Sequence, residues 1–179
     1  MEEVIEVLWQ KGDLWRFLIM IFVTLGTHKQ QFNRLLMEVD KLVERGKIKN
    51  VIAQIGYSTY IPKNYKWFKF LDFEKMLKVQ KKAELIVTHA GVGSIMTALD
   101  IRKPIIVVPR VPKYNEHVDD HQTFTAKELE NQGRVIAVYD IKNLGKAIER
   151  AKKFKPKIIK QKSRILDIVG DAIRKWENK

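Results

Sequence analysis

Two short glycine-containing segments carry the residue types that could bind an anionic ligand. The first, Gly26-Thr27-His28, and the second, residues 89–94 (HAGVGS), each follow an apolar run. Glycine lets the backbone approach a ligand closely, and free N–H groups at the start of a helix attract phosphate. Each segment alone is equally well explained as a tight strand-to-helix turn, with Ser94 as a helix cap. Two such segments at one edge of a sheet favour an anionic ligand.

Several nucleotide and nucleophile motifs are absent or incomplete. A dinucleotide fingerprint would need a small residue after Gly91 and Gly93, where the chain has Met96. The sequence contains no G-K-[ST], so it has no P-loop. Ser94 does not stand in the G-x-S-x-G sequence of a nucleophile elbow. These motifs therefore give no support to a dehydrogenase, a P-loop enzyme or a serine hydrolase.

Apart from the glycine-containing segments, one polar segment could carry chemistry. It contains His117, Asp119, Asp120 and His121. Their spacing matches no standard metal site, and a polar loop that leads into a helix explains them more simply. We therefore predict no metal and no cofactor.

The elements that position these segments alternate between strands and helices, which predicts an α/β fold with a parallel, Rossmann-like sheet and helices on both faces. A capping-box spacing of Thr27 and Gln30 predicts a helix from about Lys29 to Gly46, and Asp140 is predicted to cap another. The predicted strands are 17–25, 51–55, 67–71, 85–88, 105–108 and 135–138. The other predicted helices are 1–11, 73–82, 94–102, 120–133, 141–153 and 157–176.

The composition fits one globular domain. The chain has 179 residues, of which 45% are apolar and 31% charged. It contains no cysteine, which excludes disulfides and thiolate chemistry and fits a reducing cytoplasm. The longest apolar stretch, residues 17–26, has about half the length of a membrane helix, and the acidic start of the chain is unlike a signal peptide.

The net charge of +13 has two explanations, a lysine-rich solvated surface or an anionic partner. Nucleic acid is the weaker partner, because the basic residues form no aromatic-interleaved reading motif and no helix-turn-helix signature. The basic run 152–164 is either a solvated helix face or an attraction to anionic lipid.

Five motifs occur in the order found in the carboxyl-terminal domain of glycosyltransferase family 28, and the chain resembles a stand-alone version of that domain. They are FVTLGT (22–27), FLDF (70–73), THAGVGSI (88–95), KPIIVVPR (103–110) and NEHVDDHQ (115–122). The chain is similar to the small catalytic subunits of two-component glycosyltransferases, among them exopolysaccharide, capsule and dolichol-linked N-acetylglucosamine transferases. The resemblance implies the donor-binding half of a GT-B fold.

The resemblance also implies the division of the chain. Residues 20–154 would form the UDP-sugar-binding domain and 155–179 a C-terminal helix. Relatives begin at the first strand, so residues 1–19 would be either an added helix and linker or sequence upstream of the true start.

By the same resemblance, specific residues would bind the parts of a UDP-sugar. The HAGVGS loop (His89, Ala90, Gly91, Val92, Gly93, Ser94), with Gly26, Thr27 and His28 opposite, would hold the diphosphate. Phe70 and Leu71 fall in the uracil-binding loop. His121 and Gln122 match the polar pair for the sugar hydroxyls. Thr97 replaces a ribose-binding glutamate, and a hydroxyl cannot clamp two ribose hydroxyls as a carboxylate can.

The implied activity is hexosyl transfer from a UDP-sugar to a lipid-linked acceptor in polysaccharide or glycan biosynthesis. The base that activates the acceptor would belong to a separate, membrane-anchored, acceptor-binding subunit, which would hold this chain at the inner face of the membrane. Two other functions remain open: a sugar-nucleotide epimerase or hydrolase of similar fold, and a basic nucleic-acid-binding module.

Overall fold

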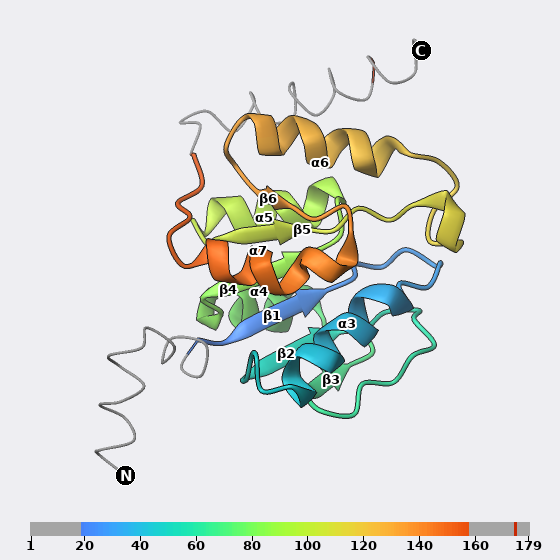
Figure 1. Cartoon of the computed structure of the whole chain (residues 1–179), viewed down its shortest axis with the longest axis vertical. Helices are drawn as coiled ribbons and strands as arrows, with labels where there is room; N and C mark the ends of the chain where they lie inside the picture. The colour runs from blue at the N-terminus through green and yellow to red at the C-terminus, as the bar shows by residue number, and fades with distance from the viewer. Residues whose placement is uncertain (1–18, 158–173, 175–179) are drawn as a thin grey trace.

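The structure, a computed structural model, describes residues 19–157 and residue 174. Within this part, six strands form one parallel sheet in the order β3-β2-β1-β4-β5-β6 (Figure 1). The strands are β1 (Ile21–Thr24), β2 (Val51–Gln54), β3 (Lys66–Phe68), β4 (Leu85–Thr88), β5 (Ile105–Val107) and β6 (Ile136–Ala137). The first strand, β1, lies in the middle of the sheet, β2 and β3 extend one half outward, and β4, β5 and β6 then form the other half. Such a reversal of strand order creates a crevice at the carboxyl ends of the central strands.

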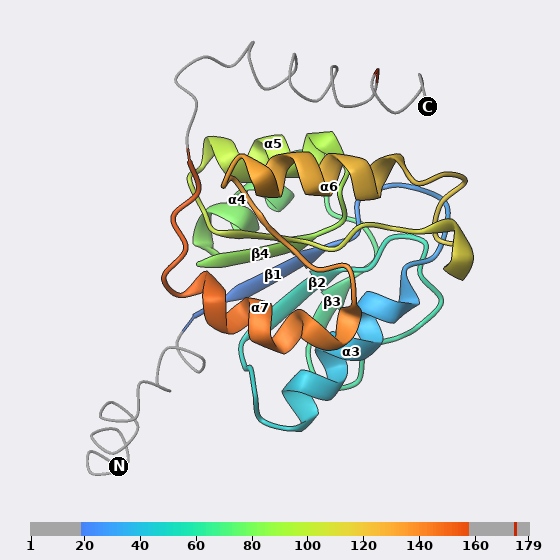
Figure 2. The same ribbon diagram turned by 45° about the horizontal axis from the view of Figure 1, so that its top comes forward.

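Helices cover both faces of the sheet, as Figure 2 shows: α4, α5 and α6 lie on one face and α3 and α7 on the other. Their bounds are α3 (Asn33–Glu44), α4 (Phe73–Lys82), α5 (Val92–Asp100), α6 (His121–Asn131) and α7 (Leu144–Ala151), with short 3₁₀ turns η1 (Pro112–Tyr114) and η2 (Ile141–Asn143). The predicted α/β class and parallel sheet are confirmed.

The apolar strands form because each has a covered layer on both sides. In β1, Ile21 and Val23 point into the core shared with α3 and α7, whereas Phe22 points into the core below α5 and α6. This alternation follows from the period of two in a strand. All four residues of β1 and of β4 are buried, which explains why their sequences are continuous apolar runs.

The start of α3 differs from the prediction. The helix begins at Asn33 rather than near Lys29, and its N-cap residue, Phe32, makes no side-chain cap. The backbone N–H of Phe32 instead donates to Ser58 Oγ at 2.9 Å, in the loop after β2. A tertiary contact therefore replaces the predicted capping box of Thr27 and Gln30.

The start of α5 also differs. The helix begins at Val92, two residues earlier than predicted, and its N-cap is Gly91, which has no side chain to cap with. The explanation of Ser94 as a helix cap is therefore wrong.

Several observed strands are shorter than predicted by a few residues, because a strand ends where its pairing with the neighbouring strand ends. Asp140 caps the 3₁₀ turn η2 through Lys142 N, at 3.1 Å, rather than α7 directly. The predicted helix over 1–11 and most of that over 157–176 lie outside the described residues, as does much of the basic run 152–164. Within the described part, no helix combines the length and apolar character needed to cross a bilayer.

Candidate functional site

A cavity of about 1100 Å³ opens at the carboxyl edge of the central strands. Because β1 and β4 pair in parallel, with Thr24 beside Thr88, the residues that follow each strand come out side by side. The two glycine-containing segments therefore lie side by side in one wall of the cavity, as predicted. The residues that line the cavity are Gly26, Thr27, His28, Lys29, Gln30, Gln54, Phe73, Met76, His89, Gly91, Gly93, Ser94, Thr97, His117, Val118, Asp119, His121 and Gln122.

The imidazole of His89 lies between the two segments. A Cβ atom added at Gly26 would stand 2.5 Å from His89 Cε1, and one added at Gly91 would stand 2.1 Å from His89 Nε2. Gly26 also has a φ of +68°, a left-handed conformation that favours glycine. These two glycines are therefore required by the histidine ring, before any ligand is considered. At Gly93 an added Cβ would meet nothing within 4 Å.

His89 is neutral at physiological pH. Burial, together with the positive charge of Arg110, lowers the pKa of His89 to about 3. The hydroxyl of Thr88 donates to Thr24 O at 3.0 Å, and its oxygen lies 3.3 Å from His89 Nδ1. Since that hydroxyl hydrogen is already used, Nδ1 must carry the ring hydrogen to bond there. Nε2, on the Gly91 side, is left as a hydrogen-bond acceptor.

The first turn of α5 presents unbonded N–H groups. The first intrahelical bond is from Ile95 N to Gly91 O at 3.2 Å, and the structure describes no acceptor for the amides of Val92, Gly93 and Ser94. Gly93 and Ser94 line the cavity, and no side chain caps this end of the helix with a hydrogen bond. The positive end of the helix dipole and these donors make a site for a negative group.

Thr97, one turn further along α5, also lines the cavity. Its hydroxyl donates to Gly93 O at 2.9 Å, a bond back to the preceding turn. The hydroxyl oxygen can therefore still accept a hydrogen bond from a ligand, but its hydrogen is occupied.

Two histidines and one aspartate gather on the opposite wall, where His28 of the first glycine segment meets them. Asp119 Oδ1 lies 3.0 Å from His117 Nδ1 and also contacts His121 Nδ1. The His117 ring stacks on His28, with centroids 4.9 Å apart, and meets the His121 ring edge-on at 4.5 Å. Burial lowers the pKa of His117 and, together with Arg110, that of His28. For Asp119, burial raises the pKa, but the His121 N–H and the two histidines outweigh it and bring the pKa below its ordinary value.

Gln122, the second residue of α6, is buried at the base of the same wall. Its Oε1 accepts from Arg110 N at 3.1 Å, while its Nε2 has no partner among the described residues. The Gln122 amide can thus donate into the cavity that it lines.

Four of the predicted site residues do not line the cavity: Phe70, Leu71, Ala90 and Val92. Phe70 is 41% exposed and packs edge-on against Tyr57 at 5.1 Å. Leu71 is positioned by its N–H, which donates to Gln54 Oε1 at 3.2 Å. The wall next to them is made by Phe73 and Met76.

Eight lining residues were not predicted: Lys29, Gln30, Gln54, Phe73, Met76, His117, Val118 and Asp119. A signal existed for four of them. Gln54 is the last residue of β2, at the edge where ligands bind, and Lys29 directly follows the first glycine segment. His117 and Asp119 belong to the same polar segment as His121.

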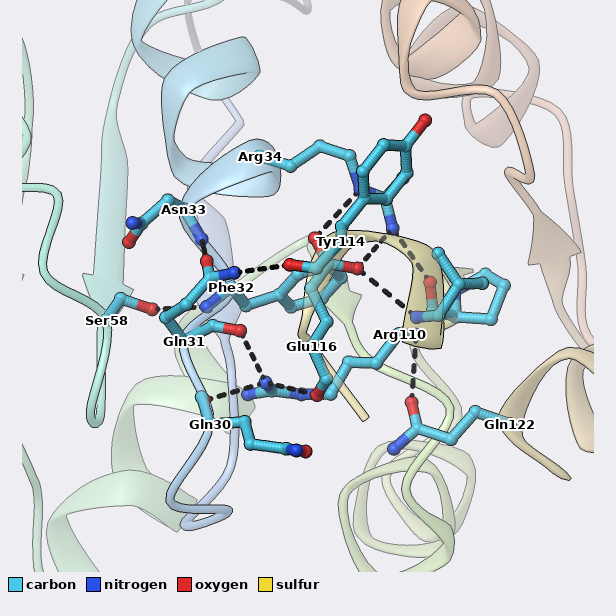
Figure 3. Close-up of polar contacts among 12 residues, drawn as sticks. Gln30, Gln31, Phe32, Asn33, Arg34, Ser58, Arg110, Tyr114, Glu116 and Gln122 are labelled. Carbon is cyan, nitrogen blue, oxygen red and sulfur yellow. Dashed lines mark hydrogen bonds and ion pairs between the residues drawn. The ribbon is translucent and has the colours of Figure 1, made fainter. Parts of the chain in front are cut away.

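A buried ionic cluster holds the loops behind this wall (Figure 3). The Arg110 guanidinium is 1% exposed and donates to the carbonyls of Leu25, Gln30, Gln31 and Glu116. Glu116 is fully buried and forms an ion pair with Arg34 at 2.8 Å. Burial lowers the pKa of Arg110 to about 10, so the side chain stays charged at neutral pH. The loops after β1 and β5 are thereby fixed to each other.

Two curated relatives of this chain are the same protein from two organisms. The UDP-N-acetylglucosamine transferase subunit ALG13 of Mus musculus is 31% identical over 124 residues, and that of Homo sapiens 33% over 126 residues. Each alignment covers 64% of this chain, but the chain spans only 10% of the length of either relative. The NDP-glycosyltransferase YjiC of Bacillus licheniformis is 34% identical over 73 residues, 41% of this chain and 16% of that protein.

Solved structures share the fold. An NMR structure of ALG13 matches with a TM-score of 0.58 at 20% identity, over 84% of this chain and 94% of that one. The crystal structure of MurG from Acinetobacter baumannii matches with a TM-score of 0.54 at 18% identity, over 75% and 41% of the two chains. At these identities the likeness establishes the fold, a GT-B-type α/β domain.

The family model for the glycosyltransferase family 28 C-terminal domain matches residues 20–174, most of the chain. The matched range contains every residue that lines the cavity. The chain therefore belongs to the glycosyltransferase family 28 C-terminal domain family.

Proposed function

We propose that this chain is the donor-binding subunit of a UDP-sugar-dependent hexosyltransferase. The observation that carries the proposal is the uncapped start of α5, whose unbonded N–H groups line a cavity between two glycine segments. Relatives named as a UDP-N-acetylglucosamine transferase subunit support a UDP-sugar as the donor.

The chemistry of transfer fits this end of the helix. When a sugar leaves a UDP-sugar, negative charge develops on the departing diphosphate. Fixed N–H donors stabilise such a charge without reorganising. The amides of Gly93 and Ser94 would donate to it from α5, and Lys29 would add a positive charge from the opposite segment.

The remaining groups would bind the rest of the donor. The Gln122 amide donates toward the sugar hydroxyls, with His121 beside it. Thr97 accepts a bond from one ribose hydroxyl, a weaker contact than a carboxylate would make. Phe70 and Leu71 lie just outside the cavity, so a uracil on them would extend the site toward Tyr57.

The acceptor half of the enzyme would come from another protein. Among the described residues that line the cavity, Asp119 is the one carboxylate, and it is already bonded to two histidines. We therefore propose that the base lies on a membrane-anchored partner that binds a lipid-linked acceptor and brings this chain to the inner face of the membrane. The relatives' designation as a subunit supports a partner.

Calorimetry with UDP tests the donor site. The full chain should bind UDP in the presence of EDTA, and Gly93→Leu should weaken that binding at least about tenfold, since Gly93 lines the cavity and an added Cβ there meets no protein atom within 4 Å. Asn131→Leu is the matched control, because it adds the same side chain at an exposed position outside the cavity. Absence of uridine nucleotide binding at millimolar concentration would refute the proposal.

Incubation with labelled UDP-sugars separates the transferase from the alternative. An epimerase or hydrolase of this fold needs no partner, so the chain alone would convert the donor. A donor-binding subunit alone would leave it intact, and transfer to a lipid acceptor would begin when the partner is added. Full-rate transfer by the isolated chain would contradict the need for a partner.

A further inference from the structure

Gln54 is a buried amide at the edge of the sheet where the cavity opens. It is the last residue of β2, with Thr24 of β1 on one side and Phe68 of β3 on the other. The residue is 2% exposed, and it lines the cavity. Because a buried amide is costly unless its polar atoms are bonded, the partners of Gln54 show which segments it holds in place.

The two polar atoms of this side chain bond to two different segments. Gln54 Oε1 accepts from the backbone N–H of Leu71 at 3.2 Å, and Nε2 donates to the carbonyl of Gly26 at 3.5 Å. An N–H group can only donate and a carbonyl can only accept, so these two partners fix the orientation of the amide. One side chain therefore connects the first glycine segment to the segment that contains Phe70 and Leu71.

The same two segments also pack closely at Gly56. A Cβ atom added there would stand 3.0 Å from Gly26 O and 3.9 Å from Phe70 Cε1, and the φ of Gly56, +56°, is left-handed. The Gly56 N–H donates to Lys69 O at 2.9 Å. The carbonyl of Gly26 and the ring of Phe70 are thus held at a set separation by the residues at the end of β2.

The two segments offer different chemistry to a ligand. Gly26 lines the cavity together with the first turn of α5, whose N–H groups suit a negative group. Phe70 and Tyr57 are 41% and 46% exposed and form an edge-on pair, which gives an apolar aromatic surface just outside the cavity. A nucleoside diphosphate carries its phosphates and its planar base on opposite ends of a ribose. Such a ligand needs both surfaces at one separation.

We propose that Gln54 is a positioning residue that sets the separation between the first glycine segment and the Phe70 ring. The inference rests on the proposed function, because it takes UDP as the ligand that spans the two surfaces. Gln54 acts through its bonds to Leu71 and Gly26 rather than by contact with the ligand. Loss of these bonds frees the ring from the glycine segment, so a bound nucleotide keeps its phosphate contacts and loses the base contact.

A double-mutant cycle on UDP binding tests this coupling. In calorimetry with EDTA, Phe70→Ala should weaken UDP binding at least about fivefold, the effect of losing one stacked base. Gln54→Met, which has nearly the same shape and makes neither bond, should weaken binding by a similar factor. The double variant should bind UDP within about twofold of either single variant, because both changes remove the same contact.

Gln132→Met is the matched control for this cycle. It makes the same substitution at a partly buried position outside the cavity and should leave UDP binding unchanged. Thermal melting verifies that each variant is folded, and Gln54→Asn, whose amide is shorter by one methylene, replaces Gln54→Met if the latter unfolds. Additive losses in the double variant would overturn the proposal, because Gln54 would then contact the ligand directly. So would an unchanged UDP affinity in either single variant.

Amide hydrogen exchange tests the position of Leu71 without any ligand. By NMR, Gln54→Met should speed exchange of the Leu71 N–H at least about threefold, whereas Gln54→Glu, which keeps an acceptor there, should not. The N–H of Lys75, bonded to Asp72 Oδ1 at 2.8 Å, is the internal reference. Unchanged Leu71 exchange in Gln54→Met would contradict the proposal. Failure of the unaltered chain to bind UDP concerns the proposed function instead, so the two failures are distinguishable.

Discussion

Two clusters of charged and polar side chains lie next to each other in this protein, and they are built in opposite ways. In the cluster around Arg110 and Glu116, the side chains are buried and bond to backbone carbonyls or to Arg34. In the cluster around His117 and Asp119, the side chains bond mainly to one another and face a cavity.

The difference in partners gives the two clusters different roles: the Arg110 cluster supports the loops, and the histidine cluster is available to a ligand. A buried charge without partners is costly, so the Arg110 cluster has to be satisfied within the protein, and its bonds fix the two loops. The histidine cluster keeps donor and acceptor atoms turned to the cavity, where a ligand can use them. Both clusters come from one short segment, residues 110–122, so the same loop performs the two tasks on its two sides.

The largest effect is expected at Arg110. Arg110→Met removes the donors of four carbonyl groups and should lower the free energy of unfolding by at least about 3 kcal/mol. Urea unfolding measures the change. Lys127→Met, the same substitution at an exposed position of α6, is the control and should cost less than about 0.5 kcal/mol. Equal losses in the two variants would show that the cluster gives no support.

The next effect is a dependence on pH at His89. The pKa of this side chain is about 3 in the folded protein and about 6.5 in an unfolded chain. Between these values the unfolded chain binds one more proton, so stability falls as the pH falls. From pH 6 to pH 4 this contribution amounts to about 2.5 kcal/mol.

Urea unfolding of the protein and of His89→Asn at both pH values measures the contribution of His89. The variant should lose correspondingly less stability on acidification, whatever its stability at neutral pH. Parallel losses in the two proteins would contradict a neutral, buried His89.

A smaller effect distinguishes the two glycines of the HAGVGS loop. Gly91→Ala places a methyl group 2.1 Å from His89 Nε2 and should cost about 1–3 kcal/mol, because the buried ring must shift. Gly93→Ala meets nothing and should leave stability unchanged or slightly higher. Thermal unfolding of the pair compares them directly. Equal destabilisation would mean that Gly91 is not needed by the ring.

The smallest effect on stability is expected in the histidine cluster. His121→Asn removes a side chain that is one third exposed, together with its contact to Asp119, and should change the free energy of unfolding by less than about 1 kcal/mol. Urea unfolding measures this change. A loss as large as that of Arg110→Met would remove the distinction between the two clusters.

The sequence predicted the sheet and the position of the two glycine segments well. Continuous apolar runs such as β1 and β4 are stable in a sheet that is covered on both faces. Their parallel pairing follows from the intervening helices. The prediction that Gly26 and the HAGVGS loop meet needed nothing more than this pairing.

The failures have tertiary causes. The capping box at Thr27 was predicted from a local pattern. The helix instead begins after Phe32, whose backbone N–H donates to Ser58, a residue that only the fold brings close. The closeness of His117 and His121 depends on the bend of a loop before α6, which no fixed spacing encodes. The packing of the His89 ring against Gly91 could not be predicted either, because it also depends on the path of the loop and not on a sequence spacing.

The position of His89 has a consequence for the motion of the site. Its ring fills the space beside both Gly26 and Gly91, so neither segment can move inward alone without displacing the ring. Thr88 and Thr24 hold that ring to the two central strands. The ring therefore couples the two segments, and a ligand that binds in the cavity they line loses little free energy to ordering them. Conformational adjustment on binding would be confined to the opposite wall, where the loop before α6 carries the histidines.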